Sequence, residues 1–435
     1  MGYRNCHADC RKSSLYTVGA YDPLSDNDCI SEFYPGFSRN LDSGSVLTYA
    51  TRQRLFPFRP GGAWLDAQRL KDSFARVAMH GDAVPLYFYS DLFLRHPQIR
   101  DLFPVSMAVT RDRLVGALAR IVSHVDDLDS VRGYLADLGR DHRKFGAVAE
   151  HYRAVGTSLI ATMAYFSQEE WTPELAADWQ AAYAQVAEVM IDAAERDATI
   201  RPARWEATVV DHELRRFDIA VFRVVTSDPL EYLPGQSVSI ESCARPRIWR
   251  LYSIANAPRE DSTIDFHVRM VDGGTLSMVL ARGLAVGSRL RIGPPVGSLT
   301  LDTGSGRDVL LVAGSTGLAP LKAILEQISG LDAPPRVHLF TGAQTADGLY
   351  DTVDLEKLAV GYPWLTVIPV VSGEPGFPGE RGQLPDVVTR SGGWRDHDVY
   401  IAGPTPMVQA TTTELTASGV PSSQIHVEDF GWSEP

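Results

Sequence analysis

The sequence predicts a multidomain fold: an all-α unit first, then an antiparallel β-barrel, then an α/β unit built on a parallel sheet. Three changes in the residue pattern predict it. From about Leu65 to Ala198, apolar residues recur at three- and four-residue steps, which is typical of helices. After about Arg201, polar and apolar residues alternate, which is typical of antiparallel strands. From about Asp308, short apolar runs alternate with helical stretches, as in a parallel sheet with crossover helices.

The composition is that of an ordinary globular protein and excludes several classes of function. The 435 residues are 44% hydrophobic and 22% charged, and 41 basic against 54 acidic residues give a net charge of −13. An acidic chain is unsuited to general binding of nucleic acid or anionic membranes, which requires a basic surface. Because no run of about 18 apolar residues occurs, we expect no membrane span.

Cysteine usage and the first residues indicate the compartment. Four cysteines are too few for a disulfide framework in a chain of this length. Cys6, His7 and Cys10 are interpreted as part of a loose tail, because no matching second pair of metal ligands follows. The opening MGYRNCHADCRKSS lacks the apolar core of a secretory signal. We therefore expect a cytoplasmic protein, and we expect it to be a monomer.

Residues 1–62 show little periodicity and are rich in Ser, Asp, Gly, Tyr and Arg. We expect a disordered extension there. A start codon assigned too far upstream is the alternative interpretation.

Residues 63–199 are predicted to form the all-α unit. Apolar faces repeat along the stretches from Leu114 to Val125 and from Trp179 to Met190. In FSQEEWTPELAADW, Ser167 and Thr172 are predicted to begin helices, with Pro173 at a first helical position.

Residues 203–305 are predicted to form the barrel, and residues 306–435 the α/β unit. The barrel strands are expected in EATVVDHELRR, FDIAVFRVVT, QSVSIES and TIDFHVRMV, which alternate at period two between Pro and Gly turns. The buried parallel strands are expected in DVLLVAG, RVHLFTG, LTVIPVV and DVYIAG.

Two short motifs in the barrel suit a flavin nucleotide. In RLYS, Arg250 suits a phosphate, Tyr252 a flavin ring and Ser253 the polar edge of that ring. These four residues also fit an ordinary surface strand. GGTLS, residues 273–277, is a glycine turn before a helical stretch, where backbone N–H groups can hold a pyrophosphate.

A third motif, LLVAGSTGLAPLKAIL, begins the α/β unit. A buried strand leads into a turn with Gly314 and Gly317, and a helix is predicted to begin near Ala319 and Pro320. This geometry places a phosphate at a helix N-terminus. The spacing differs from G-x-G-x-x-G, so the motif alone does not indicate an ordinary Rossmann site.

In this order, the three motifs resemble the ferredoxin–NADP reductase superfamily. The resemblance runs from about Arg204 to Gly431 and includes LPGQSVSI, GPPVGSLTL, YIAGPTPM and HVEDFG. It implies FAD and NAD(P)H as cofactors. The FAD contacts that it implies are Arg250, Leu251, Tyr252, Ser253, His267, Gly274, Ser277 and Phe430. The NAD(P) contacts that it implies are Gly314, Thr316, Gly317, Pro320, Gly403, Pro404 and Met407.

Two departures from that family concern the nicotinamide nucleotide. Ala402 stands where the family usually has a cysteine that helps to position nicotinamide, so we expect slower hydride transfer. Gln344 stands where relatives often carry an arginine that pairs with an adenosine phosphate, so NADH is favoured over NADPH. Glu428 stands where the flavohaemoglobins carry a glutamate.

The helical half resembles the globin domain of the flavohaemoglobins, which have the same domain order. YFYSDLFLRHPQIRDLF, LGRDHRKFGAVAEHYRAVG and DWQAAYAQVAEVMI match segments of that domain. The resemblance implies haem b, with iron held by His142. It places Tyr89 on the distal side as a hydrogen-bond donor to dioxygen, Phe103 on the porphyrin face, and Tyr152 as the support of the ligand histidine. Singly, each of these aromatic residues also fits a plain core position.

Other residues around His142 depart from the family or carry no role in it. The family pairs its proximal tyrosine with a glutamate, but Ala194 aligns there, with Glu195 one residue later. Arg113 aligns with a distal glutamine and is expected either near the ligand or facing solvent. His151 is interpreted as a surface or modest packing residue. The basic cluster around the ligand is interpreted as solvated surface; it comprises Arg140, Arg143 and Lys144.

The combined resemblance implies a nitric oxide dioxygenase in which electrons pass from NAD(P)H to FAD and then to haem. Its substrates would be dioxygen and nitric oxide, and Tyr89, His142 and Tyr152 would be its catalytic residues. The departures leave two alternatives open. One is a haem and flavin reductase or oxidase that acts on another small molecule. The other is an oxygen-binding or sensing globin whose reductase keeps its iron ferrous.

Overall fold

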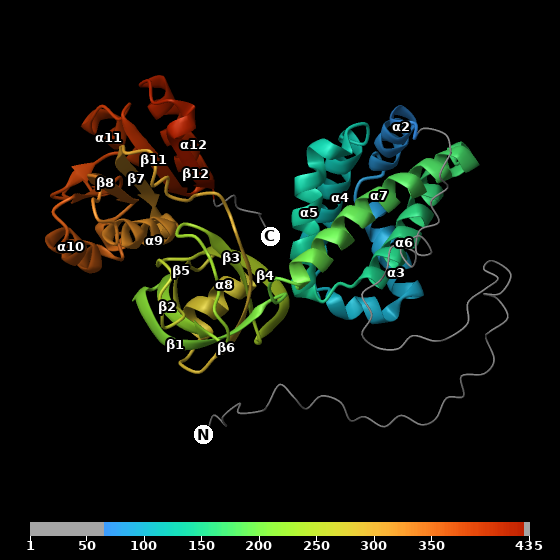
Figure 1. Cartoon of the computed structure of the whole chain (residues 1–435), viewed down its shortest axis with the longest axis horizontal. Coiled ribbons are helices and arrows are strands. Elements are labelled where there is room, and N and C mark those ends of the chain that lie inside the picture. The colour runs from blue at the N-terminus through green and yellow to red at the C-terminus, as the bar shows by residue number, and fades with distance from the viewer. Residues whose placement is uncertain (1–64, 430–435) are drawn as a thin grey trace. The chain divides into compact units, whose positions relative to one another are not determined.

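The structure is a computed structural model, and it describes residues 65–429. The predicted extension, residues 1–62, and Phe430 lie outside this range. Helices come first, then an antiparallel sheet, then a parallel sheet with helices, so the predicted fold class is confirmed (Figure 1).

Long helices joined by short turns form the first unit. They are α2 (Ala67–Ala78), α3 (Ala83–Arg95), α4 (Ala108–Ser123), α5 (Arg132–His142), α6 (Ala149–Ser167) and α7 (Pro173–Ala198). Short 3-10 helices connect them: η1 (Pro97–Leu102), η2 (Leu128–Val131), η3 (Arg143–Phe145) and η4 (Gln168–Glu170). The apolar faces of these helices make one core, which includes Leu70, Phe88, Leu92, Met163 and Trp179.

Helix α5 crosses α7 very closely, and a glycine makes this possible. A Cβ atom on Gly139 would overlap the backbone of Met190. Since α5 ends at His142, this crossing fixes the distance between α7 and the predicted iron ligand.

The predicted start of α7 is confirmed. The Thr172 hydroxyl accepts a hydrogen bond from the backbone N–H of Leu175 (3.2 Å), and Pro173 is the first helical residue. Ser167, in contrast, does not begin an α-helix, because it is the last residue of α6. Gln168 has a φ of +45°, and a left-handed residue ends the helix there.

The second unit is a six-stranded antiparallel sheet that closes on itself. Its strands are β1 (Trp205–Arg216), β2 (Ile219–Thr226), β3 (Ser237–Ser242), β4 (Arg245–Ser253), β5 (Thr263–Arg269) and β6 (Arg289–Val296), in the order β4-β3-β6-β1-β2-β5. A bridge between Ile254 and Phe266 joins the two edges, so the sheet forms a barrel. Helix α8 (Thr275–Met278) and the π turn η5 (Val279–Gly283) follow β5.

The third unit is a six-stranded parallel sheet in the order β10-β9-β8-β7-β11-β12. Its strands are β7 (Asp308–Gly314), β8 (Val337–Ala343), β9 (Leu365–Val371), β10 (Glu380–Arg381), β11 (His397–Gly403) and β12 (Ile425–Asp429). Its helices are α9 (Leu318–Ser329), α10 (Thr352–Gly361), α11 (Leu384–Ser391) and α12 (Thr405–Ala417). Short 3-10 turns complete it: η6 (Ser315–Gly317), η7 (Ala346–Gly348) and η8 (Ser422–Gln424).

Helices cover both faces of the parallel sheet. Leu321 of α9 and Leu355 of α10 join the core on one face, and Val387 of α11 and Leu415 of α12 join the core on the other. Strand β7 lies between β8 and β11, so the chain winds away from it in two directions. The carboxyl ends of β7 and β11 therefore form a topological switch point, which is where open α/β sheets bind ligands.

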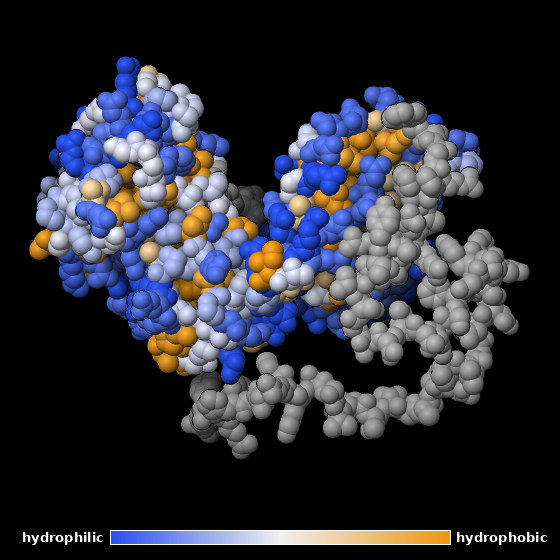
Figure 2. All heavy atoms as spheres, in the orientation of Figure 1, coloured by the Kyte–Doolittle hydropathy of each residue, from blue (hydrophilic) through white to orange (hydrophobic). Residues whose placement is uncertain are grey.

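The face of the described part that Figure 2 shows is mostly hydrophilic, with apolar side chains in small groups. Within residues 65–429, no helix is both long and apolar enough to cross a membrane.

Gly139→Ala is expected to destabilise the helical unit, because the added methyl group pushes α5 away from α7. Overpacking of this kind costs about 1–3 kcal/mol, so the thermal midpoint of the circular dichroism signal at 222 nm falls. Gly133→Ala is the matched control in the same helix, because its added Cβ meets no atom within 4 Å. The control gains up to about 1 kcal/mol from helix propensity. Equal midpoints for the two variants would contradict the close crossing.

Candidate functional site

His142 is held in one orientation at the end of α5. Its Nδ1 lies 2.6 Å from the backbone carbonyl of Leu138, one helical turn earlier. A carbonyl only accepts, so Nδ1 carries the proton and the Nε2 lone pair is left for a metal ion. Burial lowers the pKa of His142, which favours the neutral imidazole that a metal ion needs.

An aromatic cluster forms the predicted distal side. Tyr89 lies in α3, and its ring contacts Phe93 (centroids 5.7 Å apart) and Phe103 (5.5 Å). The Tyr89 hydroxyl is within 3.4 Å of the Thr110 carbonyl on α4. Burial raises the pKa of Tyr89, so its hydroxyl keeps its proton and remains a donor. Phe93 was not among the predicted residues, although its spacing of four from Tyr89 places both on one helix face.

Tyr152 lies in α6 with its hydroxyl buried and without a hydrogen-bond partner among the described residues. Burial raises its pKa to about 12. The expected glutamate position holds Ala194, which has no polar side-chain atom to offer. Tyr183 of α7 approaches instead, and its hydroxyl donates to the backbone carbonyl of Tyr152 (2.5 Å). Its ring lies so close that a Cβ atom on Gly156 would overlap it.

Two of the three residues in the basic cluster around His142 are buried, so the interpretation of this cluster as solvated surface is wrong for them. Arg143 forms an ion pair with Asp197, and both side chains are at least nine-tenths buried. Lys144 is 6% exposed, pairs with Asp141 (2.5 Å) and lies over the Phe145 ring (5.1 Å). Each charge is buried because a carboxylate compensates it, and sequence spacing alone does not reveal such pairing.

Arg113 and His151 take peripheral positions. Arg113 is exposed on α4, while Thr110, one turn earlier, is the residue that contacts Tyr89. His151 has a structural role: its Nδ1 accepts a hydrogen bond from the backbone N–H of Val148 (3.2 Å) and so caps the start of α6.

The side chains of the helical unit fit the haem that the sequence resemblance implies. A histidine with its Nδ1 occupied can present Nε2 to iron, and a carbonyl partner of this kind is usual for ligating histidines. The rings of the buried Tyr89 and of the partly buried Phe93 and Phe103 provide the apolar surroundings that a porphyrin requires.

The RLYS motif lies on β4 as predicted, and its side chains divide between two faces. Arg250 and Tyr252 point to one side and Leu251 to the other, where it is exposed. Arg250 donates to its neighbour's carbonyl (3.0 Å) and forms no ion pair with a carboxylate of the described residues. Burial lowers its pKa. A partly buried guanidinium without a counter-ion is suited to a phosphate, so Arg250 fits the FAD that the family implies.

Glu428 of the last strand reaches the flavin motif. Its carboxylate accepts hydrogen bonds from the hydroxyls of Ser253 (3.1 Å) and Ser237. Burial raises the pKa of Glu428, so a proton is held there more readily than at an exposed glutamate. This contact brings together residues 175 positions apart in the sequence.

The GGTLS motif forms a tight turn before α8, which packs against β4. A Cβ atom on Gly274 would meet the Ser277 hydroxyl at 2.5 Å and the Val271 carbonyl at 2.9 Å. Ser277 accepts from the Val271 N–H and donates to the Gly274 carbonyl, both at 3.2 Å. The hydroxyl of Ser277 therefore closes the turn. The groups that the turn can offer to a pyrophosphate are those of its backbone.

His267 is buried with a partner from the α/β unit. Its Nδ1 lies 2.7 Å from the Tyr350 hydroxyl, and its side chain is 6% exposed. Burial, with Lys322 and Arg215 nearby, lowers the pKa of His267 well below its ordinary value. Its bond to Tyr350 leaves only Nε2 for a flavin.

The predicted nicotinamide-nucleotide residues meet at the switch point of the parallel sheet. A Cβ atom on Gly314 would contact Met407 (2.7 Å) and Pro404 (3.1 Å), and one on Gly403 would contact Met407 and the Gly314 carbonyl. Gly403 has a φ of +151°, which favours glycine. The ends of β7 and β11 thus approach each other closely, and only glycine fits at these two positions.

The turn of this third motif is packed against β11. A Cβ atom on Gly317 would overlap the Ala402 carbonyl, so a glycine is required there. Thr316 lies in the turn, partly buried, and Pro320 is a buried residue in the first turn of α9, which begins at Leu318 close to the predicted start. The first residues of α9, Leu318 to Leu321, are buried, so the partly buried turn residues Ser315 and Thr316 are the part of this motif open to a pyrophosphate.

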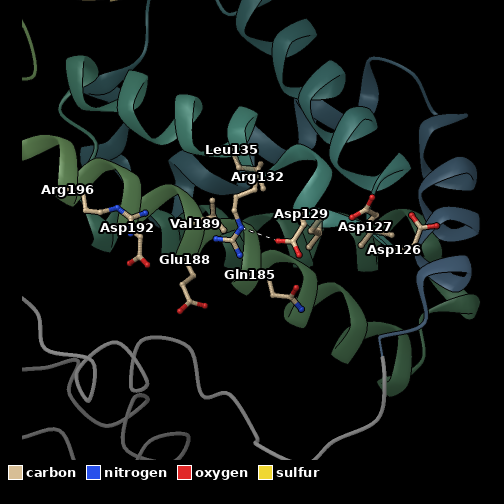
Figure 3. Close-up of a pocket in the computed structure, with 12 residues that line it drawn as sticks. Asp126, Asp127, Asp129, Arg132, Leu135, Gln185, Glu188, Val189, Asp192 and Arg196 are labelled. Atoms are coloured by element: carbon tan, nitrogen blue, oxygen red, sulfur yellow. Dashed lines mark hydrogen bonds and ion pairs between the residues drawn. The ribbon is translucent and has the colours of Figure 1, made fainter.

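A hollow of about 510 Å³ lies elsewhere, on the outside of the helical unit between α5, α7 and the turn before α5 (Figure 3). Its charged side chains are partly paired, Arg132 with Asp129 (3.1 Å) and Asp126 with Lys71 (2.9 Å). None of the residues assigned to haem or nucleotides lines it.

Known proteins match all three units. The globin family model matches residues 86–190, the oxidoreductase FAD-binding domain model residues 206–301, and the oxidoreductase NAD-binding domain model residues 311–413. These matches follow the order of the helical unit, the barrel and the parallel sheet.

The chain is similar over most of its length to flavohemoproteins. The flavohemoprotein of Bordetella pertussis is 29% identical over 382 residues, which cover 81% of this chain and 94% of that protein. That of Rhizobium meliloti is 26% identical and covers 82% of this chain and 94% of its own. A solved flavohemoglobin from Malassezia yamatoensis, with bound FAD and heme, has the same fold, with a TM-score of 0.70 at 17% identity over 86% of this chain and all of that chain.

The C-terminal half is also similar to a separate reductase. The ferredoxin–NAD(P)+ reductase component of the naphthalene 1,2-dioxygenase/salicylate 5-hydroxylase systems of a Ralstonia species is 33% identical over 245 residues. The match covers 54% of this chain and 71% of that protein.

The pH dependence of stability is expected to report on His267. In the unfolded chain a histidine takes up a proton near pH 6.5, but the buried His267 resists it, so the free energy of unfolding falls as the pH drops below that value. One such group accounts for up to about 1.4 kcal/mol per pH unit. His267→Asn keeps a polar partner for Tyr350 and removes the titration, so the stability difference between wild type and variant should shrink from pH 7.5 to 5.5.

The measurement is urea unfolding at each pH, followed by circular dichroism. His124→Asn, at an exposed histidine, is the control for loss of an imidazole. A difference between wild type and His267→Asn that stays constant over this pH range would contradict a neutral, buried His267.

Proposed function

Because this chain belongs to the flavohaemoprotein family, with globin, FAD-binding and NAD-binding domains in that order, we propose that it converts nitric oxide and dioxygen to nitrate. Its coarser activity follows from the family: it is an oxidoreductase in which electrons pass from NAD(P)H through FAD to the globin. When bound, FAD supplies the change from two-electron to single-electron transfer, and haem iron supplies the place where dioxygen and nitric oxide react.

One observation supports the dioxygenase proposal above the others. A buried tyrosine hydroxyl that keeps its proton, Tyr89, lies among aromatic rings in the same unit as a histidine prepared to ligate iron. A fixed donor in dry surroundings can stabilise dioxygen as it gains negative charge, without rearrangement. Phe93 and Phe103 keep water away from that hydroxyl.

The reductase residues have complementary tasks in this proposal. Arg250 binds a phosphate of FAD, and the turn at Gly274 presents backbone N–H groups to its pyrophosphate. Ser253, linked to Glu428, holds a proton at the polar edge of the flavin site. The nicotinamide nucleotide binds at the ends of β7 and β11, beside Gly314 and Gly403.

A second candidate function rests on Tyr152. Its hydroxyl is unpartnered and Ala194 provides no carboxylate, so His142 lacks the charged support that the family provides. An oxidase that releases peroxide, or a globin that only binds dioxygen, would tolerate this arrangement. Product analysis distinguishes them: nitrate in proportion to the nitric oxide consumed supports the dioxygenase, and peroxide formation supports the oxidase.

Tyr89→Phe is expected to speed dioxygen release about tenfold, because the lost hydrogen bond is worth about 1.4 kcal/mol. Nitric oxide consumption at limiting dioxygen should fall with it. Stopped-flow absorption measures the first, and a nitric oxide electrode with nitrate analysis the second. Tyr165→Phe is the matched control, because that tyrosine is 56% exposed and stacks on Tyr87 instead.

The proposal fails if wild-type protein that carries haem and FAD consumes nitric oxide no faster than protein that carries FAD alone. Unchanged dioxygen release in Tyr89→Phe would contradict the distal role of that hydroxyl.

The nucleotide preference is expected to depend on Gln344, which is exposed at the end of β8. We propose that the chain uses NADH in preference to NADPH, because this position lacks a cation. Gln344→Arg should lower the KM for NADPH about tenfold, as one added charge-assisted contact to phosphate does, and leave that for NADH nearly unchanged.

Ferricyanide reduction with each nucleotide measures this preference. Gln180→Arg, an exposed position in the helical unit, makes the same change of charge and is the control. No gain for NADPH in Gln344→Arg would place the adenosine phosphate elsewhere.

A further inference from the structure

Charged side chains, rather than a continuous apolar surface, join the FAD-binding barrel to the NAD-binding sheet. A cavity of about 490 Å³ lies between them, lined by β1, β2 and β5 on the barrel side and by α9 and α10 on the other. Because close packing is interrupted there, the contacts at the rim of the cavity must set the spacing of the two domains.

Glu326 of α9 makes the most extensive of these contacts. Its carboxylate accepts hydrogen bonds from Arg259 Nε (2.9 Å) and Nη2 (3.1 Å), and also from the backbone N–H of Ala257 (3.2 Å). A paired fork of this kind fixes orientation as well as distance. Arg259 is itself held from the barrel side by Asp265 (3.0 Å). Burial alone would lower the pKa of Arg259, but its bond to Glu326 and the charge of Asp265 keep it raised.

The loop that carries Arg259 is a rigid continuation of the flavin-binding strand. It leaves β4 at Ser253, and three residues later Asn256 is completely buried. The Asn256 side-chain amide donates to Tyr232 Oη (3.1 Å), to the Ala257 carbonyl (2.7 Å) and to the Thr263 carbonyl (3.0 Å). Its carbonyl oxygen accepts from the Asp265 N–H (2.7 Å). A displacement of Ala257 would therefore be transmitted to Ser253.

On the other side, α9 is a rigid continuation of the nucleotide-binding turn. The helix begins at Leu318, directly after the turn, and Gly317 packs against the Ala402 carbonyl of β11. Glu326 lies two turns further along the same helix. One carboxylate thus connects the strand that carries the predicted flavin residues to the helix that begins after the turn at Gly314 and Gly317.

We propose that Glu326, through Arg259 and Ala257, is a positioning residue that sets the distance between the bound nicotinamide and the flavin. The proposal rests on the reductase part of the proposed function and does not depend on nitric oxide. The reaction that it serves is hydride transfer: a C–H bond of NADH breaks, an N–H bond of the flavin forms, and two electrons move with the hydride. A misplacement of about 1 Å in such a reaction costs up to about 100-fold in rate.

A second contact allows this proposal to be tested without separating the domains. Asp351, which is 2% exposed, accepts hydrogen bonds from Lys322 (2.5 Å) and from Arg215 of the barrel (3.4 Å). Arg215 also binds Asp354 (2.9 Å). Since this contact remains when Glu326 is changed, the loss of Glu326 should tilt the domains rather than unfold them.

The experiment follows anaerobic reduction of bound FAD by NADH in the complete, FAD-loaded chain by stopped-flow absorption. Glu326→Gln removes the charge and Glu326→Asp shortens the arm but keeps the charge. The limiting rate of flavin bleaching should fall at least tenfold in Glu326→Gln and by an intermediate factor in Glu326→Asp. The apparent Kd for NADH and the FAD content should stay within twofold of wild type.

Two further variants sharpen the result. Arg259→Met combined with Glu326→Gln should slow the rate by less than the product of the two separate factors, because both changes break the contact between these two residues. Glu380→Gln is the matched control, since it removes an acid from an exposed pair with Arg390 (2.8 Å) in the same domain. It should leave the limiting rate unchanged.

An unchanged limiting rate in FAD-loaded Glu326→Gln would overturn the proposal, and so would a loss explained by a weaker Kd for NADH. If Glu326→Gln does not retain FAD, Glu326→Asp decides by the same criteria. Failure of NADH to bleach the flavin of wild-type protein would instead contradict the reductase function itself, so the two failures are distinguishable.

Discussion

Both halves of this chain depend on one constraint: segments of backbone lie so close together that only glycine fits between them. In the globin domain, Gly139 lets α5 cross α7 and so fixes the position of His142. In the NAD-binding domain, Gly314, Gly317 and Gly403 let two strand ends and a turn lie close together. A Cβ atom at Gly139 or Gly317 would overlap backbone, which is costly because backbone cannot change rotamer as a side chain does. A Cβ atom at Gly314 or Gly403 would press on the Met407 side chain, and at Gly403 also on the Gly314 carbonyl.

Ion pairs between charged side chains fix the orientation of the elements that the glycines allow to approach. Two cations next to His142 in the sequence are buried, because Arg143 pairs with Asp197 and Lys144 pairs with Asp141. Ion pairs also connect the two reductase domains beside the cavity between them. Glu326 binds Arg259 there, and Asp351 binds Arg215. Buried pairs of this kind contribute little net stability, but they favour one geometry over others.

The chain departs from the family pattern in both halves, at Ala402 in the reductase and at Ala194 in the globin. In the reductase, Gly314, Gly403, Pro404 and Met407 lie together at the ends of β7 and β11, and the Glu428 carboxylate reaches Ser253. On the proximal side of the globin, in contrast, Tyr152 keeps an unpartnered hydroxyl, and Tyr183 bonds to its backbone instead. Among the described residues, the Tyr152 hydroxyl therefore has no carboxylate partner, whereas the family resemblance predicts one.

The sequence by itself determined the three domains, the helix start at Thr172 and the residues of the cofactor motifs, because hydrophobic period, capping and glycine turns are local properties. Only the tertiary structure decided that Ser277 closes its own turn, that His267 pairs with Tyr350 and that Lys144 is buried. It also decided the role of Phe93 and of the Glu326 contact with Arg259. The pairs of His267 with Tyr350 and of Glu326 with Arg259 join residues far apart, and such pairs leave no period in the sequence. The contacts of Ser277, Lys144 and Phe93 join near neighbours, but the backbone path and the burial that the fold imposes decide their geometry.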